Sequence, residues 1–385
     1  MIHAGELIAK KTGSVNPENY PEEIFELYSV PAFDSRMPEI IEGRQIGSTK
    51  QIVKPNDVLL CKIVPHIRRS WVVEKNKGRR IIASSEWIVF RGDKFWPDYL
   101  RHFLVSNCFH ARFMQTVSGV GGSLLRARPS EVARIKIPLP SLPEQKRIAA
   151  ILDKADALRE KRRQAIAKLD ELLQSVFLDM FGDPVTNPMG WTVVKSHSIY
   201  SSNPKIGTIR PANGKGYKIV RVGELGQKNI DFKSCGRVDL SQADFERFSL
   251  KKGDTVIARA IGSENQLGKA SYFDGYNEPV VFDSHVMRLR PNRLICDPKW
   301  FFFLLSSPRG KFILQKKGGA TAVQFNINSK QVSDLDIPLP PISAQKDFSD
   351  FFSRVDVDQA KQINQLIRLE VFFSSLQHRA FKGEL

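Results

Sequence analysis

The stretch Ile137-Pro138-Leu139-Pro140 recurs as Ile337-Pro338-Leu339-Pro340, at an offset of 200 in a chain of 385 residues. Aligned without a gap, residues 137–183 and 337–383 share eleven identities, whereas average composition would give roughly three by chance. The identities outside the motif are Gln145/Gln345, Lys146/Lys346, Asp156/Asp356, Lys161/Lys361, Leu169/Leu369, Ser175/Ser375 and Phe181/Phe381. Self-similarity at a fixed offset indicates a duplicated unit, so the sequence predicts two copies of an A segment followed by a B segment.

The net charge of +17 divides along this repeat. Residues 1–136 carry +7 and residues 184–336 carry +10, whereas residues 137–183 and 337–385 carry equal numbers of basic and acidic side chains. A basic excess favours an anionic partner such as nucleic acid. The two A segments are therefore the expected binding domains, and the neutral B segments are expected to have another role.

Each B segment predicts a long helix. In the first copy, Ser141 suits the N-cap, no Gly or Pro interrupts residues 145–181, and Gly182 suits the C-cap. At 1.5 Å per residue, the first helix would form a rod of about 57 Å. Polar residues around Arg162 and in 358–365 favour antiparallel packing of the two helices, because a polar residue on a coiled-coil seam fixes its register. The alternative is two separate helices, each packed on its own domain.

An apolar heptad gives the expected seam of this intramolecular antiparallel coiled coil. Leu152, Ile166, Leu173 and Met180 widen the apolar stripe of the first helix. The expected seam residues are Ile148, Ile151, Ala155, Leu158, Arg162, Leu169, Leu172, Val176, Phe348, Phe351, Val355, Gln362, Leu369, Phe372 and Leu376.

The A segments predict compact α+β domains. Short apolar or alternating runs predict strands, and two segments that open on a proline predict helices. The expected strands include 57–64, 86–90, 255–259 and 285–290, and the expected helices are 97–114 and 298–315. The predicted fold class is α+β, with two globular domains separated by two long helices and related by a pseudo-twofold internal repeat.

No motif gives a positive case for catalysis or metal binding. The four cysteines form no C-x-x-C pair, which argues against a disulfide framework or a four-thiolate metal site. The sequence contains no P-loop, no H-E-x-x-H and no G-x-S-x-G elbow. The longest apolar run is too short to span a bilayer and the N-terminus lacks a signal-peptide pattern, so we expect a cytoplasmic protein.

Basic and amide side chains in the A segments are the candidates for nucleic-acid contact, because Lys and Arg neutralise phosphates while Arg, Gln and Asn can read base edges. Gln266, Gln324 and Asn326 are the candidates for base reading. The full set of expected DNA-binding residues is Lys62, His66, Arg68, Arg69, Lys75, Lys77, Arg79, Arg80, Arg126, Arg128, Arg210, Lys215, Lys218, Arg221, Arg259, Gln266, Lys269, Lys316, Lys317, Gln324 and Asn326.

The order of these segments resembles the DNA-specificity (S) subunit of type I restriction-modification systems. The resemblance rests on the repeated IPLP-x-x-x-x-Q-K motif, each copy followed by a long helix, and on Leu142-Pro143-Glu144-Gln145-Lys146-Arg147-Ile148-Ala149 in the first copy. It covers essentially the whole chain. The second copy departs from the pattern, because Ser343-Ala344 replaces Pro143-Glu144 and its helix is more polar.

The resemblance implies a target-recognition domain at 1–136 and another at 184–336, each reading one half of a bipartite site in double-stranded DNA. It implies conserved helical regions at 137–183 and 337–385 that set the spacing and dock two methyltransferase subunits. Restriction/translocase subunits would complete the complex, and S-adenosylmethionine, ATP and Mg would belong to the partner subunits. This chain would be a non-catalytic specificity subunit with no metal site and no membrane contact. The alternative is a standalone basic two-domain DNA- or RNA-binding scaffold.

Overall fold

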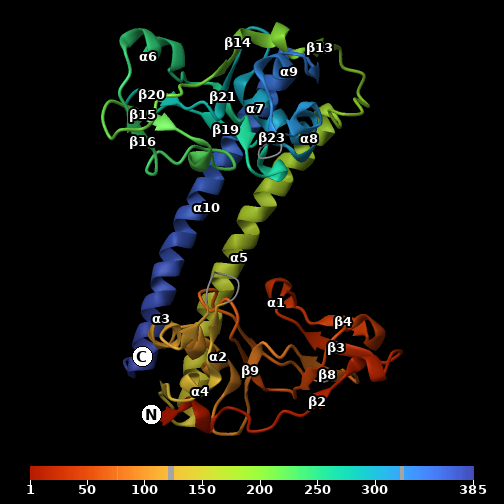
Figure 1. The fold of residues 1–385 in the computed structure, drawn as a ribbon, viewed down its shortest axis with the longest axis vertical. Coiled ribbons are helices and arrows are strands. Elements are labelled where there is room, and N and C mark those ends of the chain that lie inside the picture. The colour runs from red at the N-terminus through yellow and green to blue at the C-terminus, as the bar shows by residue number, and fades with distance from the viewer. Residues whose placement is uncertain (76, 120–124, 321–324) are drawn as a thin grey trace. The chain divides into compact units, whose positions relative to one another are not determined.

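The computed structural model describes residues 1–75, 77–119, 125–320 and 325–385. Runs of strands are followed by helices in both halves of the chain (Figure 1), in agreement with the predicted α+β class. Two compact units share the chain: one comprises Met1–Gln164 and Gln362–Leu385, and the other comprises Ala165–Lys361. Each unit therefore contains the whole of one expected A segment together with parts of both B segments. The four segment boundaries given above remain a prediction.

The first unit contains two main sheets. One has the strand order β2-β5-β8-β3-β4 and the other has the order β7-β6-β9. The strands are β1 (Ile2–His3), β2 (Ser14–Val15), β3 (Ile24–Tyr28), β4 (Glu39–Glu42), β5 (Lys50–Ile52), β6 (Val58–Cys61), β7 (Ser70–Val72), β8 (Arg80–Ala83), β9 (Trp87–Phe90), β10 (Val117–Ser118), β11 (Arg126–Ala127) and β12 (Lys136–Ile137). The helices outside the B segment are α1 (Ala32–Ser35), α2 (Pro97–Leu104), α3 (Asn107–Met114) and α4 (Pro129–Val132).

The second unit has a four-stranded sheet, β14-β21-β17-β19, and two three-stranded sheets, β16-β15-β20 and β18-β23-β22. Its strands are β13 (Val193–Lys195), β14 (Tyr200–Ile206), β15 (Tyr217–Val220), β16 (Gly236–Val238), β17 (Asp254–Ala258), β18 (Ala260–Ile261), β19 (Ala270–Phe273), β20 (Val280–Phe282), β21 (Val286–Pro291), β22 (Gly319–Ala320), β23 (Phe325–Asn326) and β24 (Asp336–Pro338). Its helices outside the B segments are α6 (Gln242–Phe248), α7 (Pro298–Ser306), α8 (Pro308–Lys317) and α9 (Ser329–Ser333).

The two expected helices 97–114 and 298–315 are each divided in two. In the first, the side chain of Ser106 accepts a hydrogen bond from the backbone N–H of Phe109 and starts α3 as its N-cap. In the second, Ser307 caps α8 in the same way and Pro308 occupies its first turn. Proline disfavours helical backbone in the residue before it, so the second division is readable from the sequence.

The repeated IPLP motif closes each domain in the same way. Ile137 pairs with Ile2 in the antiparallel β1–β12 pair, and Ile337 pairs with Val194 in the antiparallel β13–β24 pair. Both isoleucines are fully buried. The motif therefore pairs the end of each A segment with the first strand of that segment, and the long helix begins directly after it.

The glutamine of each repeat fixes the start of the long helix. Gln145 is fully buried, its Oε1 accepts the backbone N–H of Trp96 at 2.8 Å, and its Nε2 donates to the carbonyls of Pro140 at 2.9 Å and Lys94 at 3.3 Å. Gln345 is bonded in the same way to the backbone of Asp297, Pro340 and Ile295. A buried amide with all these groups satisfied is expensive to replace, which explains the repeat of this residue.

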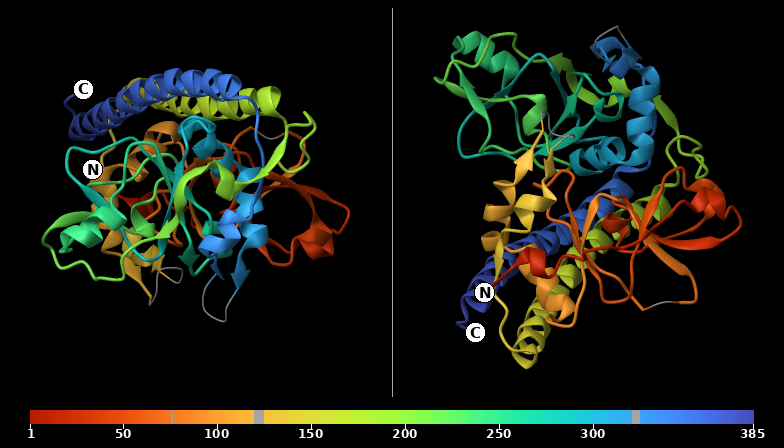
Figure 2. Two further views of the ribbon diagram at one scale, coloured as in Figure 1. Left: turned by 90° about the horizontal axis from the view of Figure 1, so that it is seen from above. Right: turned by 60° about the horizontal axis from the view of Figure 1, so that its bottom comes forward.

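The long helices are α5 (Leu142–Phe181) and α10 (Ile342–Lys382). Within the first unit, Arg147 donates to the carbonyl of Leu385 at 2.7 Å and Arg159 donates to Glu370 at 3.1 Å. Within the second unit, the ring of Phe177 packs 5.3 Å from that of Phe348. Higher residue numbers in α5 meet lower numbers in α10, so the helices pair antiparallel in each unit (Figure 2). The prediction of an intramolecular antiparallel pair is confirmed.

Three positions of the expected seam are wrong by one residue. The expected positions Leu158, Leu172 and Phe372 are 43–55% exposed, whereas Leu173 and Phe373 are buried. The buried or half-buried face of α5 comprises Ile148, Leu152, Ala155, Arg159, Arg162, Ile166, Leu169, Leu173 and Val176. Apolar residues stand at both neighbouring positions in 172–173 and 372–373, so periodicity alone does not decide between them.

The polar middles of the helices are engaged inside the pair, as predicted. In the first unit, Arg162 donates to the side chain of Gln362. In the second unit, the amide of Gln359 donates to the carbonyl of Ile166 at 3.5 Å. No helix in the described parts of the chain is long and apolar enough to cross a membrane.

Candidate nucleic-acid interface

Each unit carries a short hairpin between its helical pair α2–α3 or α7–α8 and its closing strand. In the first unit, β10 and β11 pair through Val117 and Ala127. In the second unit, β22 and β23 pair through Gly319 and Asn326. Residues 120–124 and 321–324, which join the strands of each hairpin, lie outside the described residues together with the predicted base reader Gln324.

The bases of the two hairpins are built alike. The backbone N–H of Ala127 donates to the carbonyl of Lys62 at 2.8 Å, and that of Ile327 donates to the carbonyl of Arg259 at 2.9 Å. Arg126 and Asn326, which stand 200 residues apart, occupy equivalent positions in strands β11 and β23. The structure thus gathers Lys62, Arg126 and the exposed Arg128 at one hairpin, as expected for a binding surface.

Some basic residues of the first unit already have internal partners. Arg126 donates to the carboxylate of Glu86 at 3.3 Å. Arg69 lies 3.6 Å from Asp34 and its side chain is only 12% exposed. Arg68 donates to the side chain of Asn107 at 2.6 Å. These contacts fix the arginines on the protein surface, and their expected role in DNA contact remains a prediction.

The remaining candidates of the first unit lie elsewhere along the chain. His66 is exposed and follows β6, and Lys75, Lys77, Arg79 and Arg80 flank the turn between β7 and β8. Lys77 pairs with Glu74 at 3.2 Å, and Arg80 pairs with Glu23 at 3.1 Å while its guanidinium lies 4.4 Å from the ring centre of Tyr20. Arg80 begins β8, which lies in a different sheet from β6 and from the hairpin, so we rank these four residues below Lys62, Arg126 and Arg128.

In the second unit, Arg259 orients a predicted base reader. Its guanidinium donates to the carbonyl of Ser284 at 3.0 Å, to that of Ile327 at 3.3 Å and to the side-chain oxygen of Asn326 at 3.5 Å. The last of these bonds connects Arg259 to the Asn326 amide at the hairpin base. Arg259 is half-buried and bonded within the protein, and its expected contact with DNA stays a prediction.

The loop that carries Gln266 is tied to the helix leading into the same hairpin. The amide of Gln315 in α8 donates to the carbonyls of Glu264 at 3.0 Å and Leu267 at 3.3 Å. Gln266 itself is exposed, as is Lys316 near the end of α8. Because β18 pairs with β23, the fold brings the Gln266 loop, Lys316 and Asn326 to one region of the second unit. Lys269 is half-buried after this loop, and the side chain of Lys317 lies outside the description.

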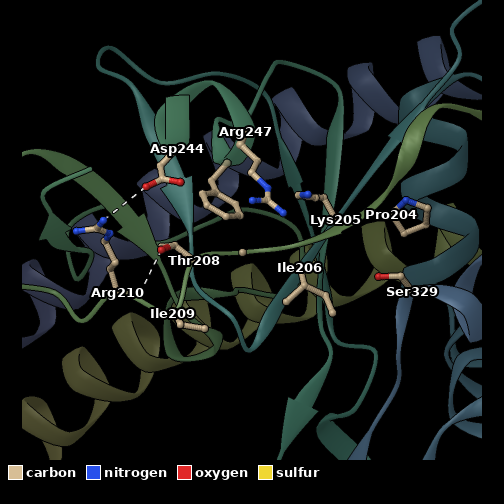
Figure 3. A pocket seen from close by; sticks show the side chains of 11 residues that line it. Pro204, Lys205, Ile206, Thr208, Ile209, Arg210, Asp244, Arg247 and Ser329 are labelled. Atoms are coloured by element: carbon tan, nitrogen blue, oxygen red, sulfur yellow. Dashed lines mark hydrogen bonds and ion pairs between the residues drawn. The ribbon is translucent and has the colours of Figure 1, made fainter. Parts of the chain in front are cut away.

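The candidates at 210–221 are divided among several partners. Arg210 is 3.8 Å from Asp244, and Arg221 donates to Glu224 at 2.8 Å. Lys218 is 14% exposed and donates to the carbonyl of Phe232 at 3.1 Å. Lys215 is exposed. Arg210 lines a pocket that it shares with Lys205 and Arg247 (Figure 3).

Lys205, Arg247 and the buried Arg288 are not among the residues that the sequence pattern singles out. Lys205 pairs directly with Arg288 across strands β14 and β21. The register of these strands shifts between Tyr200 and Ser202 and again between Ser202 and Lys205. Irregular pairing between distant strands leaves no periodic signal in the sequence, so nothing in it could align Lys205 with Arg288.

A buried ion pair recurs in both units and supports the strands below the hairpins. Asp57 and Asp254 are both buried, and each accepts two hydrogen bonds from one guanidinium, that of Arg91 at 2.6–2.7 Å and that of Arg290 at 2.7 Å. The pairing raises the pKa of Arg91. Bidentate geometry of this kind is the form in which a buried charge pair is tolerated.

The described residues contain no group of three or more His, Cys, Asp or Glu side chains placed to hold a metal ion.

Known proteins match most of the chain in sequence. The type I restriction enzyme StySPI specificity subunit of Salmonella potsdam is 23% identical over 365 residues, which cover 89% of this chain and 77% of that protein. The EcoKI specificity subunit of Escherichia coli is 21% identical over 328 residues, which cover 79% of this chain and 68% of that protein.

Solved structures share the fold. The S subunit of a type I restriction-modification system from M. genitalium has a TM-score of 0.56 and 14% identity, with coverage of 98% of this chain and 95% of that chain. A chain from work on complex assembly and conformational transition of the type I R-M system has a TM-score of 0.57 and 18% identity, with coverage of 100% and 97%. The family model for the type I restriction modification DNA specificity domain matches residues 72–169 and 188–369. The chain therefore belongs to the DNA-specificity family of type I restriction-modification systems.

Proposed function

We propose that each A segment reads one half of a bipartite DNA site and that the chain contributes no catalytic group of its own. The observation that carries this proposal is the pair of equivalent hairpin bases, with Arg126 in one basic segment and Asn326 in the other. Arginine and asparagine both have side chains suited to base-edge recognition in the major groove. Their neighbours Lys62, Arg128 and Lys316 supply positive charge for the phosphates.

The neutral helices are the proposed docking surface for two methyltransferase subunits. On α10 of the first unit, Ile363, Ile367 and Val371 recur every four residues and are 44%, 55% and 68% exposed. Residues at this spacing share one helix face, and a row of exposed apolar side chains is typical of a protein interface. S-adenosylmethionine-dependent methylation, ATP hydrolysis and cleavage would then belong to partner subunits in the cytoplasm.

Co-expression of the chain with a methyltransferase subunit tests this function. We expect the two to co-purify and the complex to shift a DNA duplex that the methyltransferase alone does not shift. Ile367→Asp with Val371→Asp should abolish co-purification while the unfolding midpoint changes little, because both side chains are exposed.

The matched control is Gln164→Asp with Ala167→Asp. It adds the same two charges at exposed positions of α5, outside the apolar row of α10, and should leave co-purification intact. Binding of duplex by the chain without any methyltransferase association would favour a standalone scaffold.

A further inference from the structure

A pocket of about 490 Å³ lies in the second unit between strand β14, the segment that follows it, and helix α6 (Figure 3). Its lining includes three basic side chains, those of Lys205, Arg210 and Arg247. The hydroxyl of Ser329 also lines it, three residues beyond Asn326 at the hairpin base. The pocket therefore borders the segment that we assign to base reading.

The positive charges of this pocket are poorly compensated. Lys205 stands directly opposite Arg288 across the sheet, and like charges in that position are destabilising. Arg247 adds a third cation, and its side chain points toward that of Lys205 (Figure 3). Within the described residues, neither Lys205 nor Arg247 has a carboxylate within salt-bridge distance. The one carboxylate in the lining is Asp244, which lies 3.8 Å from Arg210.

Arg288, the cross-strand partner of Lys205, is 6% exposed, and its Nε has no hydrogen-bond partner among the described atoms. Its Nη1 donates to the carbonyl of Ser249 at 2.9 Å, while the nearby Asp254 is bonded to Arg290. Burial and the charge of Arg290 lower the pKa of Arg288 to about 10. Burial and the charges of Arg247 and Arg288 likewise lower the pKa of Lys205. Burial and neighbouring cations thus disfavour the charged forms of Arg288 and Lys205.

The first unit has no equivalent of this cluster among its described residues. Its Asp57–Arg91 pair corresponds to Asp254–Arg290 of the second unit, and the position two residues before the arginine is the buried Val89. The repeat fold therefore does not require a cation at position 288. An anion bound in the pocket would offset the repulsion among Lys205, Arg247 and Arg288 in the second unit.

We propose that this pocket binds a phosphate of the DNA backbone beside the half-site read by the second domain, with Lys205 and Arg247 as its charged contacts and Ser329 as a hydroxyl donor. The inference rests on the proposed function, because only a DNA reader brings a backbone phosphate to the hairpin. A free phosphate ion has the same chemistry, but it would give no reason for the pocket to border the Asn326 segment.

The test uses the full-length chain, a labelled DNA duplex of arbitrary sequence, and binding measured over a range of salt concentrations. Lys205→Gln with Arg247→Gln should lower the slope of log affinity against log salt by about 0.9 for each phosphate that the variant no longer neutralises. Lys205→Arg with Arg247→Lys should keep the wild-type slope. The matched control, Lys233→Gln with Lys251→Gln, removes two exposed lysines of the same unit outside the pocket and should also keep it. The thermal midpoint of the Gln double variant should not fall, because a repulsion is removed.

The outcomes separate this inference from the function on which it rests. Wild-type chain that binds no duplex, either alone or in complex with a methyltransferase subunit, would contradict both. Two results would overturn the pocket proposal and leave the proposed function standing. One is duplex binding with an unchanged salt slope in the Gln double variant. The other is an equal decrease of the salt slope in the lysine control. In a third outcome, inorganic phosphate stabilises only the wild type against heat, while both proteins show the same salt slope of DNA binding. Such a result would assign the pocket to a free phosphate ion and overturn the contact with the DNA backbone.

Discussion

Gln145 and Gln345 show how a repeated residue can be explained by its hydrogen bonds. Each amide is fully buried and connects the entry of a long helix to the residue before α2 or α7. Both glutamines can be identified from the sequence, because they occupy the same position of the repeat. Their partners were not predictable, because Trp96 and Asp297 are bonded through their backbone, and backbone groups carry no sequence signal.

Replacing Gln145 by Ala should lower the free energy of unfolding by about 3 kcal/mol, because a buried N–H and two buried carbonyls lose their partner. Urea unfolding of the full chain measures this change. Gln164→Ala is the control, because Gln164 is exposed on α5 and bonds Glu160 at 3.3 Å on the same helix; it should cost less than about 0.5 kcal/mol. Equal effects of the two substitutions would contradict the role given to Gln145.

Leu158 and Arg159 illustrate the limit of pattern recognition at a single position. Hydrophobicity favours Leu158 as the buried residue, yet its side chain is 55% exposed while that of Arg159 is 14% exposed. The guanidinium of Arg159 lies 4.2 Å from the ring centre of Phe373 and pairs with Asp156 at 2.8 Å. Such a site depends on three residues from two helices, so the sequence of one helix cannot reveal it.

At the scale of elements, the pairing of α5 and α10 in the first unit depends on Glu370. Burial alone would raise the pKa of Glu370, but hydrogen bonds and charges from Arg159 and Arg163 outweigh it and lower the pKa. A carboxylate with a lowered pKa stabilises the fold fully above its unfolded pKa, near 4.5, and loses that contribution as the pH falls further. The carboxylate is 41% exposed, so solvent screens part of this effect.

Glu370→Gln should therefore make unfolding less sensitive to acid. The difference in urea midpoint between variant and wild type should be largest at neutral pH and shrink below about pH 4.5. Glu171→Gln provides the control, because Glu171 is exposed on α5 and has no ion pair within the described residues. A midpoint difference for Glu370→Gln that stays constant from neutral to acid pH would show that its ion pairs do not stabilise the helix pair.

The helices are also the proposed ruler between the half-sites. Deleting one heptad from each, residues 160–166 and 359–365, removes facing segments and keeps the antiparallel register. The helix pair loses about 10.5 Å of rise, so the gap should shorten by about three base pairs while both half-site sequences stay the same. Sequencing of methylated sites in cells that carry the variant measures the gap. Changed half-sites with the original gap would refute the ruler.

At the scale of the whole molecule, the duplication and the charge division were the most predictive features of the sequence. The duplication indicated the two domains and the two helices, the polar middles of the helices indicated their antiparallel pairing, and the short apolar runs indicated the α+β class. The candidate interface was only partly predictable. Arg126 and Asn326 were candidates from their residue type, whereas the hairpin bases that hold them, the contacts of Arg259 and the Lys205–Arg288 pair depend on strand pairing across the fold.

The central claim is that two domains of one chain each read half of a DNA site. Mapping of methylated bases across the genome, in cells with the intact gene and in cells with Asn326→Ala, tests it most directly. We expect a bipartite motif with a fixed gap in cells with the intact gene, and relaxed specificity in one half only in cells with Asn326→Ala. A single uninterrupted motif, or a change in both halves on substitution of Asn326, would contradict it.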